Sequence, residues 1–250
     1  MSSRPFKAAL LAFAIGASFG NAQAQTAKGD GVITIDQAKA LAGGVAPGDA
    51  AGFPVTLSQP GSYKLTGNLT VPDADTTAIE IVGASVTLDL NGFSIIGPSV
   101  CNNAGQYTQC SPTGTGAGVL ITSPASYSRL GVAVFNGTIR GMGKIGIESA
   151  SQVGGARFEQ LQIVGNGLQG VLLHGSVLRN SVVTKNGGTG VSGSRYLLHD
   201  NIVEWNGYVG VTSGPGYSAG SGNLIGAHPT VTASGLINIG ANFCGYGLCP

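Results

Sequence analysis

One short pattern recurs three times, at intervals of twenty residues, in the second half of this chain. Each copy is a β-type run ending in Asn-Gly, with Gly-Val following after two further residues; the asparagines are Asn166, Asn186 and Asn206. A looser copy, with Gly146 and Ile147 in the Gly-Val position, precedes them. A period near twenty, made of short strand-forming runs separated by Asn and Gly, is the signature of a solenoid whose stacked turns share one continuous core.

The period accommodates three short strands and three corners in each turn, which is the arrangement of a right-handed parallel β-helix. Strand-like alternation is clean in 86–90, where Thr87 and Asp89 would point outward and the apolar residues between them inward. Leucine-rich repeats have a similar period, but they need a Leu-x-x-Leu-x-Leu framework and a helical side, and the sequence has neither. We therefore expect an all-β solenoid of roughly eight to ten turns, given the repeat length.

The N-terminal segment has a different pattern. Two basic residues precede a short apolar run, 8–19, and small residues follow it up to Ala24. This combination predicts a secretory signal peptide over 1–24, cleaved after Ala24. The alternative is a membrane anchor, but an anchor needs about 20 apolar residues, which is more than this run provides. We expect a secreted or periplasmic protein whose mature part, 25–250, is a single β-helix domain without a transmembrane segment.

Charged side chains are sparse in this chain. They make up 9% of the residues, and the formal net charge is +1. A nearly neutral balance gives no electrostatic case for binding nucleic acid or an anionic membrane. Because disorder accompanies low hydrophobicity and high charge, the 42% hydrophobic content favours a folded chain. The oligomeric state does not follow from these values.

Four cysteines lie in two close pairs. Cys101 and Cys110 bracket a polar stretch inside the irregular segment 97–117, and Cys244 and Cys249 lie at the C-terminus. Local pairing is the simplest of the three possible connectivities. Neither spacing resembles a zinc knuckle, so we expect two disulfides that restrain a loop and a chain end rather than take part in chemistry.

Two segments are predicted to cap the solenoid. Residues 34–44 read as a short amphipathic helix, with Asp36 or Thr34 as its N-cap and Gly43 at its end. A helix at this point would cover the open first turn, whose strand edges would otherwise be exposed. At the other end, 234–250 would form the C-terminal cap.

A family resemblance supports the fold. The stretch 86–97, Val-Thr-Leu-Asp-Leu-Asn-Gly-Phe-Ser-Ile-Ile-Gly, followed by the Asn-Gly-x-x-Gly-Val turns, resembles exported right-handed β-helix proteins of the pectate-lyase-like superfamily. The likeness covers roughly 61–225. It implies that Asn166, Asn186 and Asn206 form a structural ladder at one corner, with their amides bonded to each other and to the backbone. It does not specify a function, because that fold is shared by lyases, hydrolases, epimerases and adhesins.

Two polar columns are candidates for a catalytic site, because residues one period apart stack directly in a solenoid. The first column contains Glu159, Arg179 and His199, and the second contains Gln160, Asn180 and Asp200. If both columns face outward, Glu159, Arg179, His199 and Asp200 form one compact patch. Polysaccharide lyases need a base and a cation or Ca²⁺, and His199 or Arg179 could fill one of these roles. The alternative is a surface pair of Arg179 with Glu159, worth about 0–1 kcal/mol.

A second strip contains the candidates for substrate binding. Lys185 and Trp205 occupy equivalent positions in neighbouring repeats, and Tyr208 lies close to Trp205 in the sequence. If Lys185 and Trp205 face outward, the only Trp of the chain beside a cation would make a platform for stacking a sugar ring. The alternative is ordinary packing of Trp205 at a corner.

The sequence gives little sign of a metal or a cofactor. Asp73 and Asp75 have alternate carboxylates, but they lie between two predicted strands and would close the turn there. No carboxylate cluster has the number of ligands that Ca²⁺ requires, so calcium is unsupported and no cofactor is expected. The Asp-Pro-His signature of alginate epimerases, the Asp set of polygalacturonase-type hydrolases, the Gly-x-Ser-x-Gly elbow, the P-loop and the His-Glu-x-x-His motif are all absent.

Three functions fit these patterns. The first is an exported β-helix protein that interacts with extracellular or cell-envelope polysaccharide and has no clear catalytic motif. The second is a small polysaccharide lyase or related carbohydrate-active enzyme that uses the polar patch. The third is a structural or adhesive surface protein in which the solenoid acts as a rigid spacer.

Overall fold

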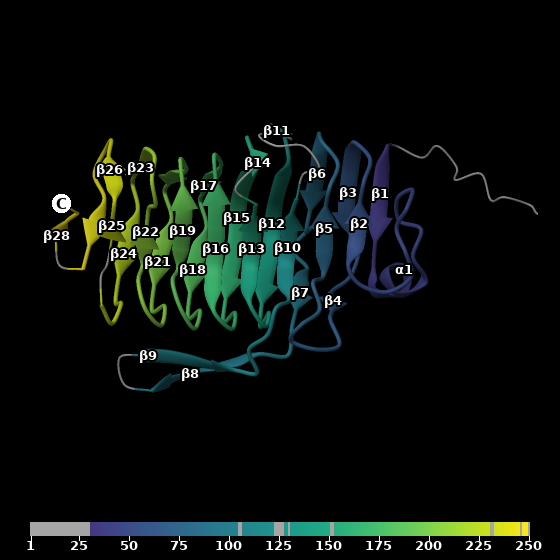
Figure 1. Cartoon of the computed structure of the whole chain (residues 1–250), viewed down its shortest axis with the longest axis horizontal. Coiled ribbons are helices and arrows are strands. Elements are labelled where there is room, and N and C mark those ends of the chain that lie inside the picture. The colour runs from purple at the N-terminus through teal and green to yellow at the C-terminus, as the bar shows by residue number, and fades with distance from the viewer. Residues whose placement is uncertain are drawn as a thin grey trace, which may run out of the picture. The chain divides into compact units, whose positions relative to one another are not determined.

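The computed structural model shows a stack of short parallel strands (Figure 1). It describes residues 31–104, 107–122, 128–129, 131–150, 153–230, 233–245 and 247–249. The predicted signal peptide, 1–24, lies outside the described residues. The stack is an all-β parallel solenoid of the right-handed type, so the predicted fold class is confirmed.

Each turn contributes strands to three faces. Face 1 comprises β1 (Val32–Ile35), β3 (Gly61–Leu65), β6 (Val86–Asp89), the first part of β12 (Ala133–Arg140) and of β15 (Arg157–Val164), β17 (Val177–Arg179), β20 (Leu197–His199), β23 (Ser218–Ser221) and β26 (Leu236–Asn238). Face 2 comprises β4 (Leu69–Thr70), β7 (Ser94–Ile96), the second part of β12 and β15, β18 (Val182–Thr184), β21 (Ile202–Glu204), β24 (Leu224–Gly226) and β27 (Phe243–Cys244). Because β12 and β15 run through the bend, they join faces 1 and 2 into a single sheet.

Face 3 is a separate sheet of eight strands. It comprises β2 (Val55–Leu57), β5 (Ile79–Ile81), β10 (Ala117–Ile121), β13 (Ile145–Ser149), β16 (Gln169–His174), β19 (Val191–Ser194), β22 (Val211–Thr212) and β25 (Ala233–Ser234). Two short strands, β11 (Ser128–Arg129) and β14 (Val153–Gly154), pair with each other outside these faces.

The core is a set of columns of identical or similar apolar residues. On face 2, Ile163 pairs with Val183, which pairs with Val203, and all three are fully buried. On face 3, Val171 and Val191 form an equivalent buried column. One turn therefore continues the hydrophobic core of the next, which is how a chain of short strands buries enough apolar surface to fold.

The corner between faces 1 and 2 requires a left-handed backbone. Asn136, Gln160, Asn180 and Asp200 occupy this corner in four successive turns, with φ between 50° and 63°. Asn and Asp tolerate this conformation better than most residues, because their short side chains bond locally to the backbone. The polar column of Gln160, Asn180 and Asp200 is thus first a consequence of backbone geometry.

The solenoid has about seven turns, fewer than the eight to ten predicted. The discrepancy arises because turns in the N-terminal half are long. Ile79 on β5 pairs directly with Val119 on β10, so the whole of 97–117 belongs to one turn. The twenty-residue period holds only in the later turns.

The N-terminal helix is shorter than predicted. Helix α1 spans Gln37–Ala42, whereas Thr34 belongs to β1. Asp36 is the N-cap, because its Oδ1 accepts the backbone N–H of Lys39 at 2.8 Å, and Gly43 ends the helix with φ 74°. Thr34 instead accepts hydrogen bonds from the Lys39 ammonium through its carbonyl and its hydroxyl oxygens. Among the described residues, no helix is long and apolar enough to cross a membrane.

The segment expected to be irregular, 97–117, contains an antiparallel hairpin. Strands β8 (Val100–Ala104) and β9 (Tyr107–Ser111) pair, and the disulfide Cys101–Cys110 joins directly opposite residues. The hairpin extends alongside the lower edge of the stack toward later turns (Figure 1). Its polar composition concealed it from the sequence analysis, because neither strand has an apolar alternation.

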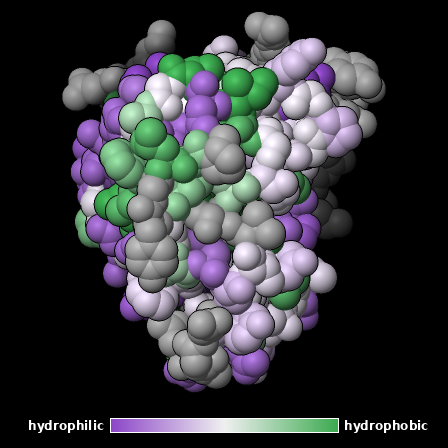
Figure 2. Space-filling view, turned by 90° about the vertical axis from the view of Figure 1, so that its left-hand side faces the viewer, coloured by the Kyte–Doolittle hydropathy of each residue, from purple (hydrophilic) through white to green (hydrophobic). Residues whose placement is uncertain are grey.

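The C-terminal end is closed by a second disulfide. Strand β27 pairs antiparallel with β28 (Gly247–Leu248), and Cys244 bonds to Cys249, so both predicted disulfides are confirmed. Seen from this end, the surface carries gathered apolar side chains (Figure 2). Ile237, Ile239 and Leu248 are among the exposed ones. The segment predicted as a cap therefore leaves apolar side chains on the surface.

Candidate functional site

The polar residues singled out on face 1 form one continuous outward row. Pairing between neighbouring strands places the members of this face-1 row in register: Lys64, Asp89, Phe135, Glu159, Arg179, His199 and Ser221. The intervening strand positions point inward and are buried, as Phe158 and Leu178 are. The structure thus brings Glu159, Arg179 and His199 together, one strand apart, on an outer surface.

In the middle of the row, around Glu159, the side chains form an ion-pair network. Arg179 Nη2 lies 2.7 Å from Glu159 Oε2, and Arg157 Nη1 lies 3.9 Å from the other carboxylate oxygen of Glu159. Glu159, Arg157 and Gln160 also line a shallow pocket of about 280 Å³ that includes Phe135. Because the Arg179 side chain is half-exposed and that of Arg157 more so, this network contributes little to stability. It does offer cations and hydrogen-bond donors to a solute in the pocket.

Toward the C-terminal turns, the row holds an imidazole between two partners. His199 Nδ1 lies 2.7 Å from the Ser221 hydroxyl, and His199 Nε2 lies 3.1 Å from Asp200 Oδ2. Asp200 reaches the ring because it occupies the left-handed corner, with φ 55°. Both side chains are half-exposed. Asn180, the equivalent of Asp200 one turn earlier, occupies the same corner.

Ser221 is the member of this group that the sequence analysis missed. A strict twenty-residue period places Ala219 one turn after His199. The turn between them is two residues longer, so that His199 pairs with Ser221 and Leu197 pairs with Ala219. Only the register of β20 against β23 reveals the serine.

The substrate-binding candidates lie at the corner between faces 2 and 3. Lys185 and Trp205 are in equivalent left-handed positions of neighbouring turns, with φ 55° and 56°. Lys185 is exposed and Trp205 is 48% exposed, so both side chains reach the surface. The preceding residues, Thr184 and Glu204, pair on face 2.

The β8–β9 hairpin packs against this same corner. The Thr108 hydroxyl donates a hydrogen bond of 2.7 Å to the backbone oxygen of Trp205. Further along the hairpin, the Cys110 sulfur lies 3.4 Å from the backbone oxygen of Asn166. A Cβ on Gly207 would lie 2.5 Å from the Thr108 carbonyl oxygen, so only glycine allows this approach. The hairpin therefore spans several turns and ends beside Trp205.

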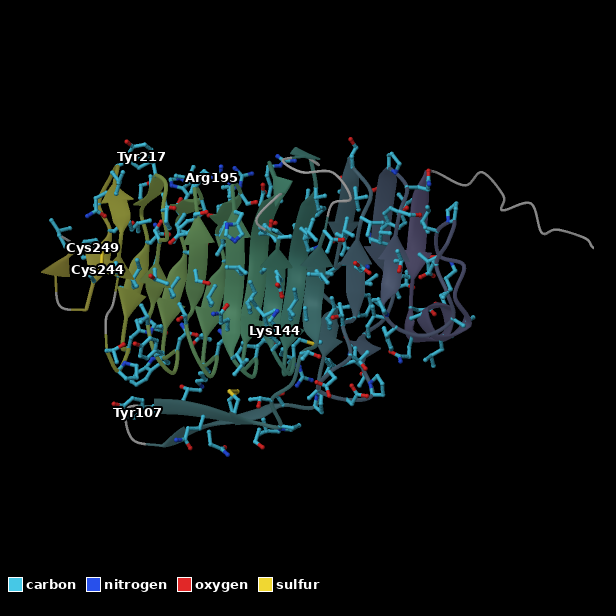
Figure 3. The ribbon with its side chains drawn as sticks, viewed as in Figure 1. Tyr107, Lys144, Arg195, Tyr217, Cys244 and Cys249 are labelled. Carbon is cyan, nitrogen blue, oxygen red and sulfur yellow. A yellow bond between two sulfur atoms is a disulfide. The ribbon has the colours of Figure 1, made fainter. Side chains whose placement is uncertain are left out.

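Three exposed aromatic residues belong to this contact or are its direct neighbours in the chain, and we call them the aromatic rim: Tyr107, Trp205 and Tyr208. Tyr107 precedes Thr108, and Tyr208 follows Gly207, so all three lie next to the contact between hairpin and corner. Tyr107 and Tyr208 are 50% and 57% exposed. Figure 3 shows Tyr107 at the start of β9, at the end of this strand that lies toward the C-terminal turns. Sequence reasoning missed Tyr107, because it lies about a hundred residues from Trp205 and only the fold brings them together.

The asparagines of the repeat form a buried ladder under this corner. Nδ2 of Asn166 donates to Oδ1 of Asn186, and Nδ2 of Asn186 donates to Oδ1 of Asn206, both at 2.8 Å. A second ladder, which the sequence analysis did not find, occupies the corner between faces 1 and 2. In it, Asn201 donates to Asn223 at 2.9 Å, and Asn223 donates to Asn242 at 2.8 Å. Its uneven spacing hid it from a search at twenty residues.

The two members of the acidic pair near the N-terminal turns have different roles: Asp73 closes the local turn, whereas Asp75 Oδ1 accepts the backbone N–H of Thr115, forty residues later, at 2.9 Å. Oδ1 of Asp73 accepts hydrogen bonds from the backbone N–H of Asp75 and from both the backbone N–H and the hydroxyl of Thr76. The hydrogen bond from the Thr76 hydroxyl is the main cause that lowers the pKa of Asp73. Within the described part of the chain, no group of three His, Cys, Asp or Glu side chains is placed to hold a metal ion.

Comparisons with known proteins find similar folds. No family model matches the sequence, and no curated protein matches it. The enzymatically active domain of bacteriophage CBA120 tailspike protein 2 is 11% identical, with a TM-score of 0.43. The match covers 75% of this chain and 38% of that protein's chain. A mutant of the periplasmic alginate epimerase AlgG is 11% identical, with a TM-score of 0.42, and the match covers 83% of this chain and 55% of the epimerase chain. The Agl-KA catalytic domain is 17% identical, with a TM-score of 0.37 and coverages of 76% and 38%. This chain thus spans between about a third and about half of the length of these structures.

Proposed function

We propose that this chain binds polysaccharide on the outside of its solenoid, with the aromatic rim as the contact site. The observation that carries the proposal is the position of Tyr107, Trp205 and Tyr208. Each is about half exposed, including Trp205, for which packing at the corner was the alternative. Lys185 adds an ammonium group one turn away at the same corner.

The chemistry of this site suits a sugar chain. Aromatic rings offer a flat apolar surface for the C–H faces of a pyranose ring, and tyrosine hydroxyl and lysine ammonium groups bond to its hydroxyls. The rim is held in place by the disulfide-linked hairpin and by the Thr108 bond to Trp205. A rigid aromatic site loses little conformational entropy on binding. The long, regular sides of a solenoid also match an extended polymer.

The compartment belongs to the same proposal. Disulfides persist in oxidising environments, and both pairs of cysteines are bridged. The proposed setting is therefore the periplasm or the outside of the cell, reached through the signal peptide predicted over 1–24. Detection of the mature protein, beginning after Ala24, outside the cytoplasm would support this part of the proposal.

The single tryptophan makes the binding test direct, because fluorescence excited at the long-wavelength edge, where tyrosine does not absorb, reports Trp205 alone. The mature protein is titrated with a panel of uronate and neutral polysaccharides, with and without calcium. We expect one glycan to shift or quench the emission, and the Trp205→Ala variant to lose retention on the same immobilised glycan. Tyr217→Ala is the matched control, because this tyrosine is 87% exposed and lies at the opposite edge of the stack from Tyr107 (Figure 3). Unchanged emission and no retention across the panel would overturn the proposal.

One observation favours the alternative of a polysaccharide lyase or related enzyme. Arg179 and His199 are paired on neighbouring strands with Glu159 beside them, so that a cation and a base share one surface. Ultraviolet absorbance of unsaturated products tests for a lyase, and turnover that disappears in Arg179→Ala would locate its site. Retention on a glycan without any product would leave the binding function in front.

A further inference from the structure

We infer that Ser221, His199 and Asp200 form an acyl-transfer site that hydrolyses esters. The three side chains are connected in the order that nucleophilic catalysis needs. The Ser221 hydroxyl is 2.7 Å from one ring nitrogen of His199, and the other ring nitrogen is 3.1 Å from the Asp200 carboxylate. A nucleophile bonded to a base, with the base oriented by a third group, is the general pattern of an activated serine.

The ring proton of His199 is assigned to Nε2. Asp200 Oδ2 lies 3.1 Å from this nitrogen, and a carboxylate only accepts hydrogen bonds, so the tautomer with Nε2–H is the one that suits this contact. The lone pair of Nδ1 then faces the Ser221 hydroxyl, as a general base requires. Asp200 therefore acts as a positioning residue, and His199 is the base.

The backbone around the site supports this arrangement. Gly222, with φ 69°, follows the serine, and a Cβ there would collide with Asp200 Oδ1. In the next turn, a Cβ on Gly240 would lie 2.8 Å from Ser221 Cβ and 3.9 Å from its Oγ. Two glycines thus leave the carboxylate in place and keep the side of the hydroxyl open. Because Asp200 and His199 are half-exposed, an ester can reach the group from solvent.

The reaction is balanced with water as the only co-reactant. Ser221 Oγ attacks the ester carbonyl carbon while its proton moves to His199 Nδ1. The bond to the leaving alkoxide breaks, and the alkoxide takes that proton, which leaves Ser221 acylated. Water, deprotonated by His199, attacks the acyl group; the carboxylic acid departs and the Ser221 hydroxyl is regenerated. The natural form of such a substrate would be an O-acyl group on a polysaccharide, a point that rests on the proposed function.

The fold supplies an internal comparison. On face 3, His174 Nδ1 lies 2.9 Å from the Ser194 hydroxyl, one turn apart, as in the proposed site. Among the described residues, however, no carboxylate forms an ion pair with His174, whereas His199 has one with Asp200. Ser194 therefore has a base but no positioning residue, and it serves as the matched control.

The test uses the full mature chain and no glycan, so its outcome is independent of polysaccharide binding. A fluorophosphonate reagent is reacted with the protein, and the modified residue is identified by peptide mass mapping. Hydrolysis of p-nitrophenyl acetate is followed for an initial burst of nitrophenol, because a good leaving group needs little help from the protein. We expect the label and the acetyl group on Ser221, with Ser221→Ala losing both the burst and the label.

Two further variants separate catalysis from structure. His199→Gln should slow acylation about 100-fold, which is the usual contribution of a general base. Asp200→Asn keeps a residue that tolerates the left-handed corner; it should slow acylation and shift the His199 tautomer, seen in the ¹⁵N spectrum of the imidazole. Ser194→Ala should leave the burst and the label unchanged. Labelling at any other residue, hydrolysis that survives Ser221→Ala, or the absence of both burst and label would overturn the inference.

Discussion

The side chain of Asn186 donates from Nδ2 to Oδ1 of Asn206 at 2.8 Å, and the same oxygen accepts the backbone N–H of Asn186 at 3.1 Å. Oδ1 of Asn186 in turn accepts the backbone N–H and the side-chain Nδ2–H of Asn166, and Asn186 is fully buried. One residue type thus satisfies a backbone donor and a side-chain donor in each turn without any water. The corner of each turn is therefore fixed by the turn that follows it.

Replacing the middle rung tests this ladder. In Asn186→Leu, two donors of Asn166 lose their acceptor inside the core, at about 1–3 kcal/mol for each unsatisfied group. We expect the free energy of unfolding to fall by about 3 kcal/mol or more, measured by chemical denaturation. Gln162→Ala on the exposed side of β15 is the control and should change it by less than about 0.5 kcal/mol. Equal effects of the two substitutions would contradict a structural role for the ladder.

The glycine of each Gly-Val pair is predicted to be as intolerant as the asparagine. A Cβ on Gly170 would lie 2.5 Å from the Gly190 carbonyl oxygen and 2.9 Å from Asn186 Nδ2. We expect Gly170→Ala to destabilise the fold by about 1–3 kcal/mol through overpacking, as a lower midpoint of thermal unfolding. Gly226→Ala is the matched control, since the nearest atom to a Cβ there is 4.0 Å away. A midpoint unchanged in Gly170→Ala would mean that the turns can separate without cost.

The fold could be predicted from the sequence because its repeat has a constant length over several turns. Where the period stays at twenty, one position fixes its neighbour in the next turn, and Glu159, Arg179 and His199 are paired as expected. The prediction fails where the turn length changes. The longer turn before Ser221 and the hairpin carrying Tyr107 both add residues that a fixed period cannot place. Both features form parts of the candidate sites, so the sites were only half predictable.

The Arg179–Glu159 pair is expected to be unimportant for folding. Its atoms are 2.7 Å apart, but Arg179 is half-exposed, and such pairs contribute about 0–1 kcal/mol. Arg179→Ala should therefore change the free energy of unfolding by less than about 1 kcal/mol, measured by urea denaturation at low salt. The double variant with Glu159→Ala closes a thermodynamic cycle for the pair. A coupling energy above about 2 kcal/mol would show that the row is structural and would weaken its use as the site of the alternative enzyme.

Two histidines should make the fold sensitive to mild acid. Burial lowers the pKa of His228 from its ordinary value, with hydrogen bonds to backbone groups of Val203 and Asn206 opposing the shift. Burial and then the charge of Arg195 lower the pKa of His174. In both cases the unfolded chain binds the proton more readily. Stability from these groups is therefore complete above the ordinary pKa of about 6.5 and is lost as the pH falls below it.

This pH dependence can be assigned by substitution. We expect the midpoint of thermal unfolding to fall as the pH is lowered from 7 toward 5. His228→Gln keeps a donor for the Val203 carbonyl but cannot be protonated, so its midpoint should vary less with pH. Adding His174→Gln should flatten the profile further. An identical slope in the wild-type chain and in both variants would exclude these two histidines as the cause.

The last prediction concerns the hairpin that completes the aromatic rim. The Thr108 hydroxyl bonds to the Trp205 carbonyl oxygen at 2.7 Å, and Thr108 is buried at that contact. Thr108→Val keeps the shape and removes the donor, which weakens the docking of the hairpin by about 1 kcal/mol. We expect hydrogen exchange of the hairpin amides to become about fivefold faster and glycan affinity at the rim to fall, with little change in global stability.

Thr230→Val is the matched control for the hairpin, because the Thr230 hydroxyl also bonds to a backbone oxygen, that of Tyr208, at 2.7 Å. It removes the same kind of bond from the same corner but does not touch the hairpin. Exchange of the β8–β9 amides should therefore stay at the wild-type rate in this variant. If Thr108→Val left both exchange and affinity unchanged, the Cys101–Cys110 disulfide and the remaining contacts would be sufficient to hold the hairpin, and Tyr107 would not depend on the bond to Trp205.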